Sequence, residues 1–140
     1  MTYRSNAPSK TLRVCHVVNA VGETTGPANH AVALQQHTSV SAGVLGWFRA
    51  DPTDETECID IHCVQAPDTA LGIDRTTARR AVSVLSEYDV VHTHHPHSAT
   101  FAKLIARRLD IPTVFTYGTP SFRYTIKGRT ANGLTNRLAD

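Results

Sequence analysis

Five short segments rich in β-branched and other apolar residues recur along this chain of 140 residues, at 11–19, 42–48, 58–64, 89–93 and 112–117. The first reads TLRVCHVVN, and its nearly continuous apolar positions are typical of a parallel strand that is buried on both faces. The third, CIDIHCV, alternates apolar and polar residues, which indicates a half-exposed strand at a sheet edge. Because parallel strands need long crossover connections, the segments between them should be helical.

Helical periodicity is present in these connecting segments. One helix should begin at Pro27 with Gly26 as its cap, and a second should begin at Asp74. The segment 98–110 should turn its apolar residues to the core and its basic residues to water; these are Phe101, Leu104, Ile105 and Leu109, and Lys103, Arg107 and Arg108. The alternation of strands and helices predicts an α/β fold, a Rossmann-like parallel sheet with helices on both faces.

Composition and charge exclude several classes of protein. The net charge of +2 is too small to indicate a nucleic-acid partner, and no apolar run is long enough to span a membrane. Residues 1–10 are polar, lack a signal-peptide pattern and are expected to be a disordered tail, so the domain should cover 11–140. Three cysteines without paired spacing should be buried apolar side chains, and they indicate a cytoplasmic location. Basic residues near both ends leave open a peripheral contact with the inner face of a membrane.

Ligands of a parallel sheet bind at the carboxyl ends of its strands, where the loops 21–26, 94–97 and 117–121 should meet. The first loop contains Gly22 and Gly26, which would let a ligand phosphate approach backbone N–H groups at the start of the next helix. The loop matches neither G-x-G-x-x-G nor a Walker sequence. A flexible turn followed by a helix cap is therefore the alternative interpretation.

Four of the eight histidines lie in the sequence H-T-H-H-P-H at 92–97. His92, His94 and His97 match the histidines of H-x-H-x-D-H, the binuclear zinc motif of metallo-β-lactamase-like hydrolases. Pro96 replaces the aspartate ligand and no histidine follows His97, so we expect no metal site, although a metal-dependent hydrolase-like site is the alternative. We expect His92 to be buried and hydrogen-bonded, and the histidines at 95 and 97 to be exposed in a loop.

Several segments together resemble the N-terminal domain of the GT-B glycosyltransferases of family 4, the retaining enzymes that use sugar nucleotides. The family has a D-[VI]-[VI]-H-x-H segment, which D-V-V-H-T-H at 89–94 matches. The resemblance spans nearly the whole chain and rests on the segments 12–18, 22–37, 89–94, 101–109, 111–116 and 133–140.

The resemblance implies roles for individual residues. His94, the second histidine of D-V-V-H-T-H, would be the catalytic residue, which hydrogen-bonds a sugar hydroxyl and stabilises charge as the glycosidic bond opens. Contacts to the donor or the acceptor are implied for Gly22, Gly26, Thr116, Tyr117 and Gly118. The family usually has T-x-H at the last three of these positions, so its histidine is missing here.

The resemblance also implies what surrounds this domain. It would be the acceptor-side half of a GT-B architecture, and a separate C-terminal domain would bind most of the UDP- or GDP-linked donor. A chain of 140 residues cannot contain both, so we expect a truncated, incomplete domain of a hexosyltransferase-type enzyme that is inactive alone. Its partners would be a nucleotide-sugar and an acceptor, namely a sugar, a lipid-linked sugar or a small molecule, with no cofactor. A non-catalytic α/β ligand-binding module is the remaining alternative.

Overall fold

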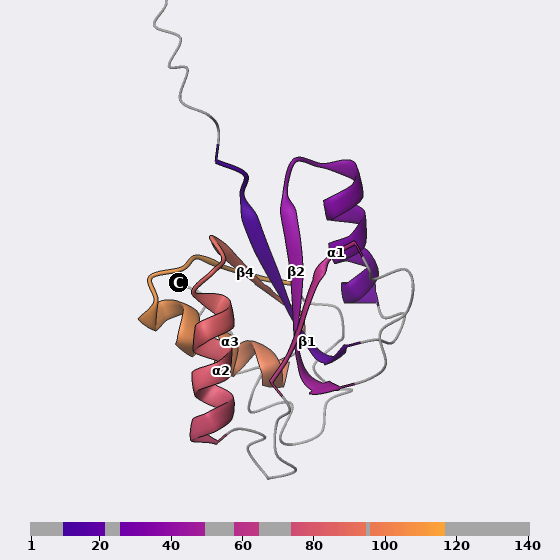
Figure 1. Ribbon diagram of the computed structural model, residues 1–140. Helices are drawn as coiled ribbons and strands as arrows, with labels where there is room; N and C mark the ends of the chain where they lie inside the picture. The colour runs from indigo at the N-terminus through magenta and orange to yellow at the C-terminus, as the bar shows by residue number, and fades with distance from the viewer. Residues whose placement is uncertain (1–9, 22–25, 50–57, 65–73, 95, 117–140) are drawn as a thin grey trace, which may run out of the picture.

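The structure, a computed structural model, describes residues 10–21, 26–49, 58–64, 74–94 and 96–116. The elements in these residues are β1 Arg13–Val21, α1 Gly26–His37, β2 Ser41–Arg49, β3 Asp60–Cys63, α2 Arg75–Leu85, β4 Val90–Thr93, α3 Pro96–Arg108 and β5 Thr113–Phe115. The strands form one parallel sheet in the order β3-β2-β1-β4-β5 (Figure 1). The prediction of a Rossmann-like parallel sheet is confirmed, and so is the edge position of the strand predicted at 58–64.

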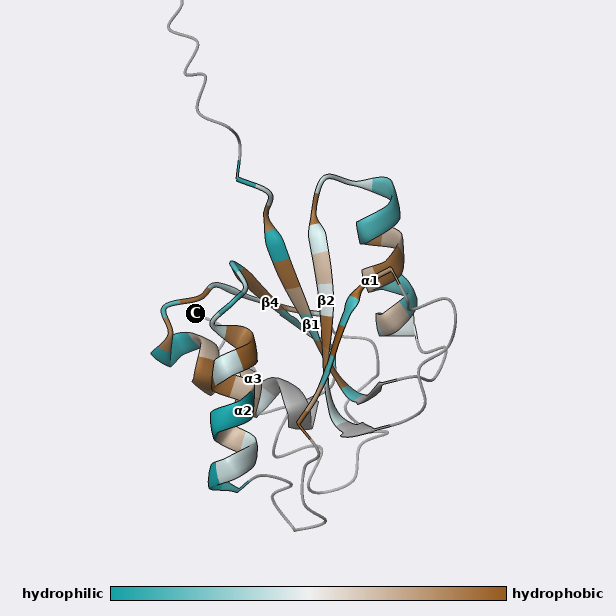
Figure 2. Cartoon of the chain, in the orientation of Figure 1, coloured by the Kyte–Doolittle hydropathy of each residue, from teal (hydrophilic) through white to brown (hydrophobic). Residues whose placement is uncertain are grey.

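Helices cover both faces of this sheet, with α1 on one side and α2 and α3 on the other (Figure 1). The buried residues of the α1 face are Val18, Ala31, Ala42, Val44 and Ile59. The opposite face has the larger cluster, which includes Cys15, Val17, Leu45, Trp47, Ala81, Leu85, Val91, Ala102, Ile105 and Ala106. Because β1 contributes to both clusters, its sequence is apolar almost throughout, and Figure 2 shows the central strands as mostly hydrophobic.

The start of α2 agrees with the sequence. The carboxylate of Asp74 accepts a hydrogen bond of 2.7 Å from the backbone N–H of Thr77, which is the usual bond of an N-cap residue. This bond holds the pKa of Asp74 below its ordinary value. No helix in the described ranges is both long and apolar enough to cross a membrane.

The bounds of α3 differ by two residues from the helix predicted at 98–110. It begins at Pro96, because proline suits the first position of a helix. It ends in a Schellman motif, in which the backbone N–H of Ile111 donates to the carbonyl of Ala106 at 2.9 Å. Asp110 adopts the left-handed conformation that this motif requires, with φ at 56°.

The predicted orientation of α3 is wrong for two residues. Lys103 is 3% exposed rather than solvated, and its ammonium nitrogen lies 5.3 Å from the centre of the Phe115 ring. Leu104 is 49% exposed rather than in the core. The physical reason is that the small Ala102 and Ala106 pack against the sheet, so the buried stripe of the helix consists of Thr100, Ala102, Lys103, Ile105 and Ala106.

The three cysteines differ in exposure. Cys15 is buried in β1, and Cys63 in β3 is partly buried. Cys58 precedes β3 and is exposed, so the prediction that all three are buried is wrong for this residue. None of the three forms a disulfide bond.

Tyr88 occupies the space above Gly43 of β2. A Cβ atom on residue 43 would lie 2.0 Å from the hydroxyl oxygen of Tyr88 and 2.7 Å from its Cζ. The ring of Tyr88 cannot easily move away, because it is 4% exposed and the guanidinium of Arg13 lies 4.8 Å from its centre. Its hydroxyl oxygen is also 3.2 Å from Nε2 of His62. Position 43 therefore requires glycine for space.

We predict that Gly43→Ala lowers the free energy of unfolding by about 1–3 kcal/mol, because the added methyl group overpacks a filled core. Gly26→Ala is the matched control, since a Cβ on residue 26 would meet no atom within 4 Å. Urea denaturation followed by circular dichroism measures both variants. Equal losses at the two positions would contradict the packing of Tyr88 against β2.

Candidate functional site

The strand order reverses at β1. The chain continues from β1 to β2 and β3 on one side and returns to β4 and β5 on the other, so β1 and β4 flank the topological switch point. β1 pairs with β2 up to Val21 and Arg49, but with β4 only up to Val17 and Thr93. The chain after β4 therefore leaves the sheet beside the carboxyl half of β1, which is where sheets of this kind bind ligands.

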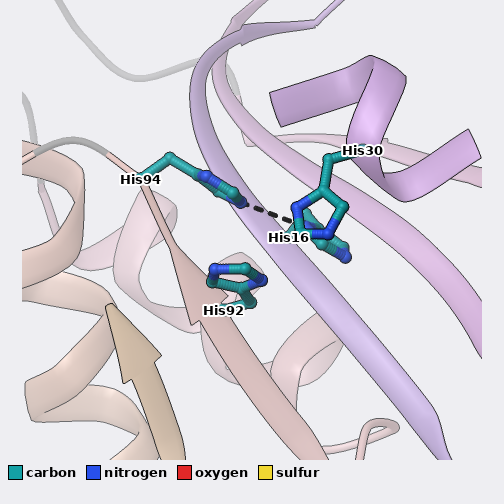
Figure 3. Close-up of side chains that lie close together, drawn as sticks. All are labelled: His16, His30, His92 and His94. Atoms are coloured by element: carbon teal, nitrogen blue, oxygen red, sulfur yellow. Dashed lines mark hydrogen bonds between the residues drawn. The ribbon is translucent and has the colours of Figure 1, made fainter. Parts of the chain in front are cut away.

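Four histidines meet at this switch point (Figure 3). His16 of β1 is the register partner of His92 of β4, so the two side chains share one face of the sheet. His94 follows β4 directly, and His30 comes from α1, the helix that covers this face. One ring nitrogen of each residue lies within 4.8 Å of those of the other three. These four residues form the histidine cluster.

All six pairs of rings in the histidine cluster are in contact. Their centroids are 4.2 to 6.1 Å apart, with the shortest distance between His92 and His94 and the longest between His30 and His94. The rings of His16 and His94 are inclined by only 19°. Nδ1 of His16 and Nε2 of His94 are hydrogen-bonded at 3.0 Å, which requires one N–H donor and one acceptor nitrogen.

Burial varies steeply across the histidine cluster. His16 is fully buried and His92 is 8% exposed, whereas His94 is partly buried and His30 is exposed. Burial, and then the neighbouring histidines, lower the pKa of His16 to about 3. Burial, and then His30, also lower the pKa of His92. His16 is therefore neutral at neutral pH, and solvent reaches the cluster beside His30 and His94.

The outer nitrogens of the two buried rings differ in their partners. Nε2 of His92 is hydrogen-bonded to the hydroxyl of Thr116 at 2.7 Å, which fixes the orientation of this ring. Nε2 of His16 is buried and has no hydrogen-bond partner in the part of the chain that the structure describes. An unsatisfied buried nitrogen is uncommon in folded proteins and needs an explanation.

The structure brings two of the sequence-predicted site residues together. His94 lies in the histidine cluster, and Thr116 contacts His92, which is buried and hydrogen-bonded as predicted. Gly26 is the first residue of α1, and the space around it would accept a side chain. Gly22, Tyr117 and Gly118, together with the loop histidine at 95, lie outside the described residues. Residue 97 belongs to the first turn of α3, so the prediction that it lies in a loop is wrong.

Sequence reasoning did not identify His16 and His30 as site residues. His16 interrupts the apolar run of β1. Because histidine is uncommon in a strand buried on both faces, this position could have been predicted as a site residue. The register that pairs it with His92 is a tertiary property, which no local pattern predicts. His30 carries no signal of its own, because exposed histidines are common on helices.

The fold is similar to those of several solved proteins. HepE of Anabaena, in a structure with UDP and glucose, aligns over 91% of this chain and 36% of its own, with a TM-score of 0.61 and 15% identity. A UDP-N-acetylglucosamine 2-epimerase aligns over 94% of this chain and 41% of its own, with a TM-score of 0.57 and 14% identity. A short-chain dehydrogenase/reductase of Veillonella parvula, in a structure with NADP, aligns over 91% of this chain and 63% of its own, with a TM-score of 0.61 and 8% identity. At these identities the similarity shows the fold, and the chain spans less than two thirds of each of these proteins.

Comparison with protein families is more specific. No curated protein matches the sequence. Residues 40–139 match the model of one family, described as Glycosyltransferase Family 4. The matched residues contain the strands from β2 to β5 and include His92, His94 and Thr116, whereas His16 and His30 precede them. With well over half of its residues matched, the chain belongs to glycosyltransferase family 4.

Proposed function

We propose that this chain forms the acceptor-side wall of a site at which a retaining glycosyltransferase moves a sugar from a nucleotide-sugar to an acceptor. One observation carries the proposal: His94 lies at the carboxyl end of β4, at the topological switch point, in a chain that belongs to glycosyltransferase family 4. Family membership favours sugar transfer over the hydrolase-like reaction and over a non-catalytic binding module.

The donor class in this proposal is a UDP- or GDP-linked sugar. Support for the UDP-linked donor comes from two proteins of similar fold, one whose structure contains UDP and glucose and one that is an epimerase of UDP-N-acetylglucosamine. The acceptor would be a sugar, a lipid-linked sugar or a small molecule. Gly22 and Gly26 would lie near the donor phosphates, and Thr116, Tyr117 and Gly118 near the donor or the acceptor.

His94 would act by hydrogen bonding. Its imidazole is only partly buried, so a sugar hydroxyl could approach the ring from solvent. The bond of 3.0 Å to His16 fixes the ring orientation, and His16 itself is immobile because it is fully buried in β1. A hydrogen-bonding group that is held in place can stabilise the charge that develops as the glycosidic bond opens, without reorganising during the reaction.

A complete transfer site needs more than this wall. Two-domain enzymes assemble the reactive geometry and exclude water by closing one domain over the other. In our proposal, the donor nucleotide is bound mainly by such a second domain, so the 140-residue chain alone should not transfer sugar.

The first test is donor binding by the 140-residue chain. With one wall of the site, UDP-glucose should bind with a Kd of about millimolar or weaker, a regime of only a few kcal/mol. In a ¹H–¹⁵N NMR titration, the amide of His94 should shift on addition of UDP-glucose. The amide signal of His37 is the control and should not shift, since α1 ends at His37 and leads into the start of β2, away from the carboxyl ends of the strands. Micromolar binding of UDP-glucose, or sugar transfer by this chain, would contradict the proposal that a second domain is needed.

The second test is substitution of His94 in a family 4 transferase that has this chain as its N-terminal domain. His94→Ala should lower turnover by about 10²-fold or more, a range typical of losing a positioned polar group. His95→Ala and His97→Ala should have much smaller effects, because the proposal gives neither residue a contact with the sugar. Steady-state rates with saturating donor measure the difference. Equal losses at the three positions would refute the role of His94.

A further inference from the structure

We propose that the histidine cluster is a binding site for one divalent transition-metal ion of the zinc type, with its four imidazoles as ligands. This inference goes beyond the proposed sugar transfer and shares only His94 with it. It also departs from the sequence-based expectation of no metal, which considered the histidines at 92, 94 and 97. The fold assembles a different set, because β1 contributes His16 and α1 contributes His30.

The donor atoms decide the class of metal. Imidazole nitrogen suits zinc, copper, nickel and iron, whereas magnesium and calcium prefer oxygen ligands. Among the residues that the structure describes, no carboxylate or thiolate joins the four imidazoles in this group. Zinc is the simplest probe, because it accepts four nitrogen ligands in a tetrahedral arrangement without redox chemistry.

The spacing of the four rings is close to what one zinc ion requires. Zn–N bonds of about 2.0–2.1 Å put tetrahedral ligand nitrogens roughly 3.3 Å apart and their ring centroids roughly 5 Å apart. Nδ1 of His16 and Nε2 of His94 are already 3.0 Å apart, and the ring centroids are separated by 4.2 to 6.1 Å. The largest nitrogen separation is 4.8 Å. His30 is exposed, so rotation of its side chain could adjust its distance to the other rings.

The surroundings of the rings favour coordination. Thr116 holds Nε2 of His92, which leaves Nδ1 of this ring as the ligand atom, as a hydrogen-bonded partner does for most metal-binding histidines. Metal binding needs neutral imidazoles, because only a deprotonated ring nitrogen has a lone pair for the ion. The proton shared between His16 and His94 would move to the other nitrogen of the ring that carries it, so that both facing nitrogens can bind the ion.

The loss of stability caused by burying His16 favours a ligand role of the histidine cluster over a purely structural one. His16 places a fully buried imidazole in β1 with its Nε2 unpaired among the described residues, and an unpaired buried polar atom lowers the stability of the fold. An apolar residue would fill the same position of the strand without that cost. Coordination of an ion through Nδ1 of His16 would give this buried imidazole a function, although Nε2 of the same ring is not the ligand atom.

Metal titration of the 140-residue chain, purified without a histidine tag and stripped with a chelator, tests the proposal. Calorimetry with Zn²⁺ should give one equivalent with a Kd of about micromolar or tighter. His30→Ala should weaken binding by roughly tenfold or more. Since His30 is exposed, this variant should fold, which circular dichroism checks. His37→Ala, an exposed histidine on the same helix, is the matched control and should bind like the original chain.

Cobalt identifies the ligands independently. Co²⁺ bound to four imidazoles should give the visible absorption of a tetrahedral site without a thiolate charge-transfer band in the near ultraviolet. A thiolate band that disappears with Cys58→Ser would place the ion at a cysteine and overturn the proposal. Absence of stoichiometric zinc binding would also overturn it, and so would equal affinities of the His30→Ala and His37→Ala variants.

Discussion

The burial of an imidazole in the middle of β1 is the constraint on which the rest of the site depends. His16 is fully enclosed, so its ring orientation is set by the sheet and by α1 rather than by solvent. The register of β1 and β4 then places His92 beside His16, and a hydrogen bond of 3.0 Å joins His94 to His16. Because burial lowers the pKa of His16 to about 3, the centre of the histidine cluster is neutral, and four imidazoles can lie in contact without strong mutual repulsion.

Much of the fold could be predicted from the sequence, because local patterns determine it. The continuous apolar run of β1, the N-cap at Asp74 and the alternation of strands and helices each have a local physical cause. The face that α3 buries could not be predicted from hydropathy, because small residues at its contact with the sheet set the rotation and enclose Lys103. The site was predicted only around His94, since His16 and His30 join it through register and helix packing.

His94 has two proposed partners, a sugar hydroxyl and a metal ion. As a sugar-binding residue it uses a ring whose orientation His16 fixes, and as a metal ligand it would offer the nitrogen that now faces His16. Both roles need the same pre-organised imidazole at the end of β4. The position at the switch point favours a ligand of either kind, because there the chain after β4 leaves the sheet while β1 continues beside β2.

Direct observation of the ring nitrogens tests the central claim, that a neutral, buried His16 organises the histidine cluster. Long-range ¹H–¹⁵N NMR spectra of the chelator-treated chain report the charge and the tautomer of each imidazole. With the pKa of His16 lowered to about 3, its ¹⁵N shifts should remain those of one neutral tautomer between about pH 8 and pH 5. Titration of His16 near the ordinary histidine value of about 6.5 would contradict the account, because it would mean that the ring is solvated and not enclosed in β1.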